Sequence, residues 1–277
     1  MKQALPDPEC IRIQVSDPAF ERDGLRNLTF YSHALQGRAD VSLFVPEGLQ
    51  TPLPVPIVIL LHGVYGSHWS WFLQGGAHVT AGTLIEQGRI RPMVIATPSD
   101  GLRGDGTGYL CGGPQNYEAF ICDDLIRCLE SLFPNANGDS AIFIAGLSMG
   151  GYGAIRLGAK YPQRFRGISA HSAITATEQF QEFVRDLTPF ASEPHEELDV
   201  LHWLACHRDK LPPLRFDCGK DDSLLEANQA LHRKLVDFAI PHEFTVFPGG
   251  HDWPYWQTHI ADTLIFCEGV LHAKEEK

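Results

Sequence analysis

The sequence predicts an α/β protein with a mostly parallel central sheet and helices on both of its faces. Short apolar runs alternate with amphipathic segments along the 277 residues, and this alternation is typical of parallel βαβ units. Residues 55–61 are continuously apolar, as strands buried on both faces are, and residues 93–97 read as a second buried strand. Because the chain contains no internal repeat or long linker, we expect one domain over residues 1–277.

The predicted strands are short apolar runs bounded by turn-forming residues. In chain order they cover residues 11–15, 27–35, 40–45, 55–61, 93–97, 141–145, 166–170, 214–218 and 243–247. Residues 36–40 resemble a turn that joins the second strand to the third. Four prolines between residues 46 and 56 predict a loop before the central strand.

The predicted helices combine apolar side chains at helical spacing with residues that end a helix. They cover residues 77–87, 116–133, 149–161, 223–238 and 254–271. Gly88 ends the first of them and Pro162 follows the third. The stretch from 171 to 213 fits neither pattern, so we expect it to be irregular. Most of it, about residues 172–213, is expected to form a small cap over the functional site.

Charge and apolar patterning exclude several classes of function. The net charge of −12 argues against nucleic acid and anionic membrane surfaces as partners. No apolar run approaches the ~18 residues that span a bilayer, and residues 1–9 have no apolar core typical of a signal peptide. The seven cysteines are scattered without a CxxC pair, which predicts reduced thiols in a cytoplasmic protein.

Histidine is abundant, with 13 residues, but the sequence has no HExxH motif. His195 and His202 lie among acidic residues and are expected to belong to a solvated helix face. We therefore expect no metal ion.

Residues 146–150 read Gly-Leu-Ser-Met-Gly, directly after an apolar strand and before a helix that opens with small residues. A strand, a G-x-S-x-G turn and a helix form a nucleophile elbow, which lifts a serine hydroxyl above a sheet. A random chain with 26 glycines would contain the pentapeptide about one time in ten, so the flanking elements carry the prediction. Ser148 is the predicted nucleophile of an acyl-transfer reaction.

A serine nucleophile needs a base, and the base needs a carboxylate that orients it. The predicted strand 214–218 leads to Asp221 and Asp222, and we favour Asp222 because it directly precedes the next helix, although it could instead be a helix cap. Asp217 lies inside the strand and is expected to point to one face of the sheet. His251 follows the last strand in a glycine-rich loop and is the predicted base, whereas His242 precedes that strand.

The tetrahedral intermediate of acyl transfer needs two N–H donors. One is expected from Met149, directly after the nucleophile, and the other from Val64, in the loop after strand 55–61. His62 is expected to be structural. Aromatic side chains in the same loops could line a substrate pocket or simply pack the loops. The candidates for the pocket are Tyr65, Trp69, Tyr109, Trp253 and Trp256.

Five motifs in this order resemble the esterase D-like family, over about residues 27–270. They are His62-Gly63, Pro98-Ser99-Asp100-Gly101, Gly146 to Ala154, Cys218-Gly219-Lys220-Asp221-Asp222 and His251-Asp252-Trp253. That family includes S-formylglutathione hydrolases, feruloyl and acetyl-xylan esterases, and mycolyltransferases. The resemblance implies an α/β-hydrolase fold, a Ser148–His251–Asp222 triad, no cofactor and a small acyl group on the substrate. Members of the family often form dimers, so the resemblance leaves a homodimer and a monomer as alternatives.

The stretch from His251 to Trp256 is similar to the carbohydrate-esterase branch of that family. S-formylglutathione hydrolases usually carry a different sequence there, and a histidine where Tyr152 stands. We therefore expect a serine carboxylesterase for small-molecule esters with acetyl-type or aryl groups. The alternatives are an S-formylglutathione hydrolase or other thioesterase, an acyltransferase, and a catalytically silent hydrolase-fold binding protein.

Overall fold

A nine-stranded sheet forms the centre of the computed structural model, which describes residues 13–47, 49, 54–100, 104–133, 140–191 and 193–275. Its strands are β1 (Ile13–Val15), β2 (Leu25–Ser32), β3 (Gly37–Phe44), β4 (Ile57–Leu61), β5 (Val94–Pro98), β8 (Ile142–Leu147), β9 (Gly167–His171), β10 (Leu214–Gly219) and β11 (Glu243–Phe247). The spatial order is β1-β2-β3-β5-β4-β8-β9-β10-β11. From β1 to β5 the neighbours pair antiparallel, and from β5 to β11 they pair parallel. The predicted mostly parallel sheet is confirmed.

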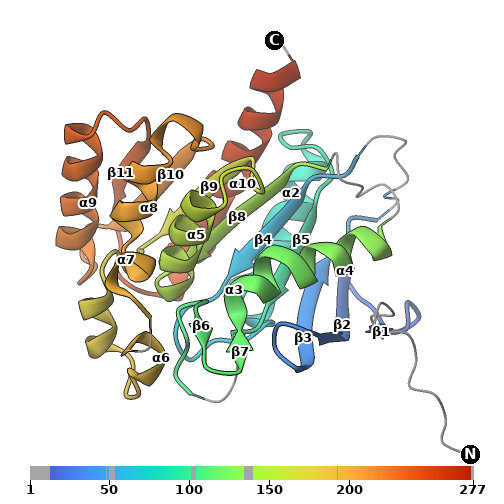
Figure 1. The fold of residues 1–277 in the computed structure, drawn as a ribbon. Coiled ribbons are helices and arrows are strands. Elements are labelled where there is room, and N and C mark those ends of the chain that lie inside the picture. The colour runs from blue at the N-terminus through green and yellow to red at the C-terminus, as the bar shows by residue number, and fades with distance from the viewer. Residues whose placement is uncertain are drawn as a thin grey trace, which may run out of the picture.

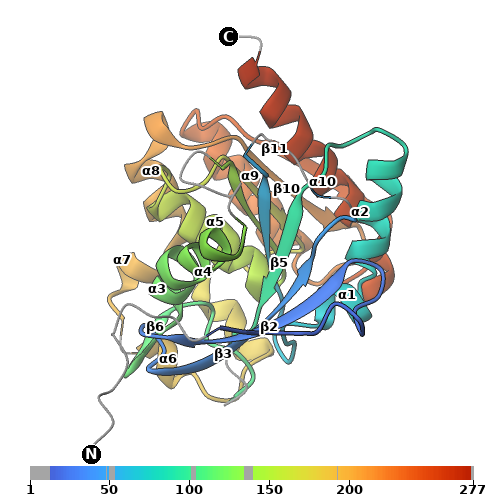
Figure 2. The same cartoon turned by 90° about the vertical axis from the view of Figure 1, so that its right-hand side faces the viewer.

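Helices cover both faces of this sheet (Figures 1 and 2). They are α1 (Ser70–Leu73), α2 (Ala77–Glu86), α3 (Tyr117–Ala119), α4 (Leu125–Leu132), α5 (Met149–Lys160), α6 (Thr188–Ala191), α7 (His195–Leu198), α8 (Val200–Cys206), α9 (Leu225–Asp237) and α10 (Trp253–Glu275). A π-helical turn over Phe120–Asp124 joins α3 to α4, where the sequence predicts one regular helix. The other elements are 3₁₀ helices at Thr177–Glu182 and Arg208–Lys210 and a hairpin of β6 (Cys111–Gly112) and β7 (Gln115–Asn116).

Strand β4 shows why the central runs are continuously apolar. Ile57, Ile59 and Leu61 belong to the core under α4, α5 and α9, whereas Val58 and Leu60 belong to the core under α2 and α10. All five side chains are fully buried. A strand with helices on both faces has no side that tolerates polar residues.

The hairpin between β2 and β3 turns earlier in the chain than the sequence predicts. The turn covers residues 33–36 rather than 36–40, because Ser32 pairs with Gly37 in the antiparallel register. Gln36 closes the turn with a φ of 51°. Residues 37–40 therefore extend β3, and the hydroxyl of Thr29 donates a hydrogen bond to Asp40 across the two strands. Residues 11 and 12 of the predicted first strand lie outside the described residues.

Residues 172–213, which we call the cap segment, contain α6, α7 and α8 rather than irregular chain alone (Figure 1). Each of these helices has four to seven residues. Runs this short do not complete enough turns for a helical period to be visible in a sequence. They are held instead by buried side chains, among them Phe190, Leu198 and Leu204, which belong to the core that contains α5.

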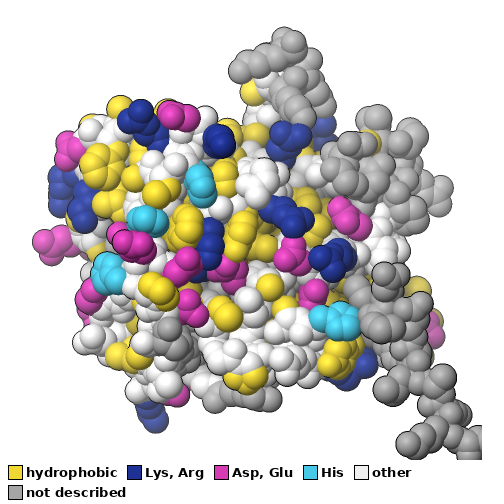
Figure 3. Space-filling view, viewed as in Figure 1, with side chains coloured by type: hydrophobic (Ala, Val, Ile, Leu, Met, Phe, Trp, Pro, Cys, Tyr) yellow, Lys and Arg dark blue, Asp and Glu magenta, His cyan; other side chains and the backbone are white. Residues whose placement is uncertain are grey.

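Acidic and basic side chains are intermixed on the face that Figure 3 shows. None of the helices in the described ranges has the length and apolarity that crossing a bilayer requires. The six cysteines in these ranges are free thiols. Cys10 and residues 1–9, which have no apolar core typical of a signal peptide, lie outside the described residues.

Candidate active site

Ser148 lies between the end of β8 and the start of α5, in a strained backbone conformation with φ 54° and ψ −119°. A Cβ at Gly146 would lie 2.3 Å from the carbonyl oxygen of Gly150, and one at Gly150 would lie 2.2 Å from the carbonyl oxygen of Leu61. Both positions therefore need glycine. The N–H of Ser148 donates to the carbonyl oxygen of His171 at 2.9 Å, which ties the turn to β9.

The three residues of the predicted triad meet at the carboxyl ends of the parallel strands. Nε2 of His251 lies 3.1 Å from Oγ of Ser148. Nδ1 of the same ring lies 3.1 and 3.0 Å from the two carboxylate oxygens of Asp222. With a proton on Nδ1, the imidazole donates to Asp222 and leaves Nε2 free to accept the serine proton.

Asp222 is buried in the turn after β10, whereas Asp221 is exposed and donates its backbone N–H to Gly249. Burial acts to raise the pKa of Asp222, but the hydrogen bond and the charge interaction with His251 outweigh it and hold the pKa below its ordinary value. Oδ1 also accepts the N–H of Leu224 at 2.8 Å, just before α9 begins. The carboxylate of Asp222 thus accepts hydrogen bonds both from the turn before α9 and from the imidazole of His251.

Asp217 is fully buried and lies in a different group of side chains. Its carboxylate accepts hydrogen bonds from Nδ1 of His171 at 3.0 Å, Nη2 of Arg215 at 2.6 Å and the hydroxyl of Tyr255 at 2.7 Å. Burial acts to raise its pKa, but His171 and Arg215 lower it to about 2. We call these four residues the buried cluster. It contacts the elbow through the carbonyl oxygen of His171, which accepts the N–H of Ser148.

The loop after β4 runs against the nucleophile. A Cβ at Gly63 would lie 2.7 Å from Cδ1 of Leu147 and 3.3 Å from the Cβ of Ser148, so a larger residue there would force Leu147 to move. The next residue is Val64, the predicted second oxyanion donor, and it lines the cavity that contains Ser148. Met149 is the first residue of α5, and the first N–H groups of a helix have no partner within it.

His62 lies fully buried under this loop. Its Nδ1–H donates to the carbonyl oxygen of Gly63 at 2.7 Å, and Nε2 accepts the N–H of Asp100 at 2.9 Å. Burial lowers the pKa of His62 to about 4, against a smaller opposing effect of the bond to Gly63. The neutral ring satisfies one donor and one acceptor, and this arrangement supports its expected structural role.

A cavity of about 460 Å³ contains Ser148 and His251. Four of the five predicted aromatic residues line it, namely Tyr65, Trp69, Trp253 and Trp256. Tyr109 does not belong to this lining. It is fully buried beneath the loop, where its hydroxyl donates to the carbonyl oxygen of His62 at 3.0 Å.

Phe183 also lines this cavity, and sequence reasoning missed it. Its ring stacks on the imidazole of His251, with centroids 5.8 Å apart and planes 20° apart. Phe183 belongs to the cap segment, where no periodicity indicates which side chains face the site.

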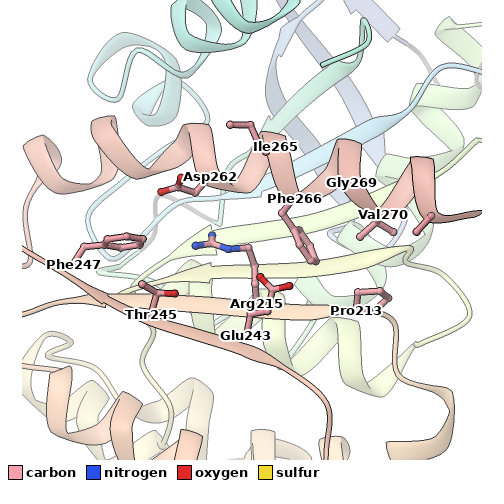
Figure 4. Close-up of a pocket in the computed structure, with 11 residues that line it drawn as sticks. Pro213, Arg215, Glu243, Thr245, Phe247, Asp262, Ile265, Phe266, Gly269 and Val270 are labelled. Atoms are coloured by element: carbon pink, nitrogen blue, oxygen red, sulfur yellow. The ribbon is translucent and has the colours of Figure 1, made fainter. Parts of the chain in front are cut away.

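A second cavity, of about 530 Å³, lies between β11 and α10 (Figure 4). Its lining shares no residue with the cavity at Ser148. Arg215 forms part of its wall, and this side chain is also a member of the buried cluster. Within the described ranges, no three His, Cys, Asp or Glu side chains are grouped as metal ligands.

Comparison with known proteins identifies the family. A family model described as "Putative esterase" matches residues 32–267. An acetyl esterase of Caldicellulosiruptor saccharolyticus is 26% identical over an alignment of 279 positions. The alignment covers 89% of this chain and 98% of the relative. The esterase Rv1288 of Mycobacterium tuberculosis is 25% identical; the match covers 80% of this chain and 54% of that protein.

Solved structures share the fold. A ferulic acid esterase has a TM-score of 0.77 at 24% identity, with 94% of this chain and 99% of that chain covered. The S-formylglutathione hydrolase FrmB of Staphylococcus aureus has a TM-score of 0.75 at 20% identity, with 92% and 98% covered. The family that the sequence motifs resemble is confirmed. The chain therefore belongs to this esterase family, has the α/β-hydrolase fold, and is a carboxylic ester hydrolase.

Proposed function

We propose that the protein is a serine carboxylesterase that works through a Ser148–His251–Asp222 triad and an acyl-enzyme. The single observation that carries this proposal is the unbroken row of hydrogen bonds from Ser148 Oγ through the His251 ring to Asp222. A serine, a base and an orienting acid in this geometry are the arrangement that activates a hydroxyl for nucleophilic attack.

In the first step, His251 takes the proton of Ser148 at Nε2 while Oγ attacks the ester carbonyl carbon. The oxyanion that forms accepts hydrogen bonds from the N–H groups of Met149 and Val64. His251 then gives the proton to the departing alkoxide, which leaves the acyl group on Ser148. A water molecule, deprotonated by His251, attacks this acyl-enzyme; the bond to Oγ breaks, His251 returns the proton to Ser148, and the acid is released. Asp222 stabilises the imidazolium in both halves of the reaction.

The substrates we propose are small-molecule esters with an acetyl-type or aryl acyl group. A cavity of about 460 Å³ lined by tryptophans suits flat or small apolar groups. The names of the acetyl esterase and the ferulic acid esterase similar to this chain agree with both kinds of group.

Hydrolysis of p-nitrophenyl acetate by wild type and Ser148→Ala tests the proposal. We expect the variant to lose nearly all turnover and all labelling by a fluorophosphonate probe. Ser131→Ala, a hydroxyl deletion on α4, is the matched control and should keep both. Unchanged turnover in Ser148→Ala would refute the triad, and products with added alcohols would distinguish acyl transfer from hydrolysis.

A further inference from the structure

The cap segment and the loop after β4 are joined at the edge of the cavity by three hydrogen bonds. The hydroxyl of Tyr65 donates to the carbonyl oxygen of Phe183. The N–H of Tyr65 donates to the carbonyl oxygen of Asp105 at 2.9 Å. Oδ2 of Asp105 accepts the N–H of Arg185 at 3.0 Å. We call Tyr65, Asp105, Phe183 and Arg185 the rim clamp.

Tyr65 is held by these bonds rather than by packing. Its φ of 61° is left-handed, a conformation that is costly for a residue with a Cβ. The side chain is 69% exposed, so burial of the ring contributes little to keeping it in place. Strain of this kind persists where surrounding contacts determine the conformation. Here those contacts come from the cap segment and from Asp105.

The rim clamp lies directly against the two proposed oxyanion donors. Tyr65 follows Val64 in the chain. Gly106 follows Asp105, and a Cβ at Gly106 would lie 2.3 Å from Sδ of Met149 and 3.9 Å from Cα of Val64. A shift of the rim clamp would therefore displace the N–H of Val64 relative to Ser148.

Phe183 connects the clamp to whatever occupies the cavity. Its ring covers the imidazole of His251, and it lines the same cavity as Ser148. A ring-sized group on the substrate can pack on Phe183, whereas an acetyl group offers little surface to do so.

We propose that Phe183 is a specificity-determining residue and that Tyr65 and Asp105 are positioning residues that couple it to the oxyanion hole. A flat group packed on Phe183 steadies the rim clamp, and the clamp holds the N–H of Val64 where the oxyanion develops. Binding energy from a remote group is thereby used in the transition state, which raises kcat rather than lowering KM alone. This inference rests on the proposed function and narrows its substrates to esters with a ring-sized acyl group.

The test compares p-nitrophenyl benzoate with p-nitrophenyl acetate, which share a leaving group. In Tyr65→Phe, which removes only the hydroxyl, kcat for the benzoate should fall about tenfold with KM nearly unchanged, because a misplaced oxyanion donor costs rate. The acetate, which offers no ring to Phe183, should lose less, so the benzoate-to-acetate ratio of kcat should fall several-fold. Asp105→Ala should give the same pattern. Tyr31→Phe removes the hydroxyl of an exposed tyrosine on β2 and should alter neither ester.

A double-mutant cycle then tests the coupling. Phe183→Leu keeps the carbonyl acceptor and removes the ring, and it should raise KM and lower kcat for the benzoate. Adding Tyr65→Phe to this variant should cost little more, because both act through one contact. Equal losses for both esters, no loss, or additive losses would overturn the inference. If Ser148→Ala abolishes turnover while Tyr65→Phe leaves the benzoate-to-acetate ratio intact, the clamp fails and the triad stands.

Discussion

The hydroxyl of Tyr255 donates a hydrogen bond to Oδ1 of Asp217 at 2.7 Å, which joins the first turn of α10 to the buried cluster. The ring of Tyr255 also packs on the loop that carries His251, since a Cβ at Gly249 would lie 2.8 Å from Cδ2 of Tyr255. The carbonyl oxygen of His171, in the same cluster, accepts the N–H of Ser148. The cluster therefore supports both the turn at Ser148 and the loop that carries His251. Buried charges are costly unless they are fully paired, and here the pairing is shared among four side chains.

Tyr255→Phe should destabilise the fold by about 2 kcal/mol, because it takes a donor from a buried carboxylate. Tyr152→Phe is the matched control: its hydroxyl donates to the neutral carbonyl oxygen of Leu198 at 2.7 Å, and its loss should cost about 1 kcal/mol. Urea unfolding of both variants checks the order. A larger loss in Tyr152→Phe would contradict the importance we give to the charged acceptor.

Asp222→Asn should lower kcat by roughly three to four orders of magnitude, because the amide no longer stabilises the imidazolium and favours the wrong tautomer of His251. Asp221→Asn is the control, since that residue is exposed and the imidazole of His251 is hydrogen-bonded to Asp222. Steady-state kinetics on p-nitrophenyl acetate decides between the two carboxylates. The assignment is wrong if the Asp221 variant is the inactive one.

Stability should fall with acid because of His62. Its pKa is about 4 in the folded protein and about 6.5 in the unfolded chain. Between these values the unfolded chain binds more protons, so the stability from this group is full above pH 6.5 and is lost as the pH falls to 4. The lost contribution is about 3 kcal/mol.

The free energy of unfolding, measured in urea between pH 4 and 7, tests this dependence. His62→Gln can still donate and accept a hydrogen bond but does not titrate, so its curve should be flatter than that of the wild type. Parallel curves would show that another group causes the acid sensitivity.

Gly150→Ala and Gly82→Ala should act in opposite directions. The first places a Cβ against the carbonyl oxygen of Leu61, and we expect a loss of at least ~2 kcal/mol together with loss of activity. Gly82 lies within α2 with no atom within 4 Å of its added Cβ, so alanine there should stabilise the fold by up to about 1 kcal/mol. Thermal unfolding and esterase assays on both variants provide the comparison.

Local patterns predicted the elements that hold the reacting groups. The buried strands β4 and β8 appear in the sequence as apolar runs, because helices cover both of their faces. The elbow at Ser148 is recognisable because the close approach of Leu61 requires glycine at 150. His251 follows the last strand, and parallel strands bring such loops to one edge of the sheet.

Local patterns could not predict the helices of the cap segment or which aromatic side chains line the cavity. Tyr109 and Trp253 are both aromatic residues in segments expected near the site. Tyr109 is nevertheless buried under His62, whereas Trp253 lines the cavity. The difference depends on where each loop folds back across the sheet, which no local spacing records. Phe183 reaches His251 for the same reason, from a turn that follows a 3₁₀ helix too short to show a period.

The sequence by itself therefore determined the order of the strands and helices, the elbow and the family, because these depend on spacing along the chain. Only the tertiary structure decided that Asp222 rather than Asp221 faces His251 and that Asp217 joins a buried cluster. It also decided that Phe183 covers the imidazole. These relationships depend on contacts between residues 29 to 68 positions apart, which form only when the sheet and its covering helices assemble.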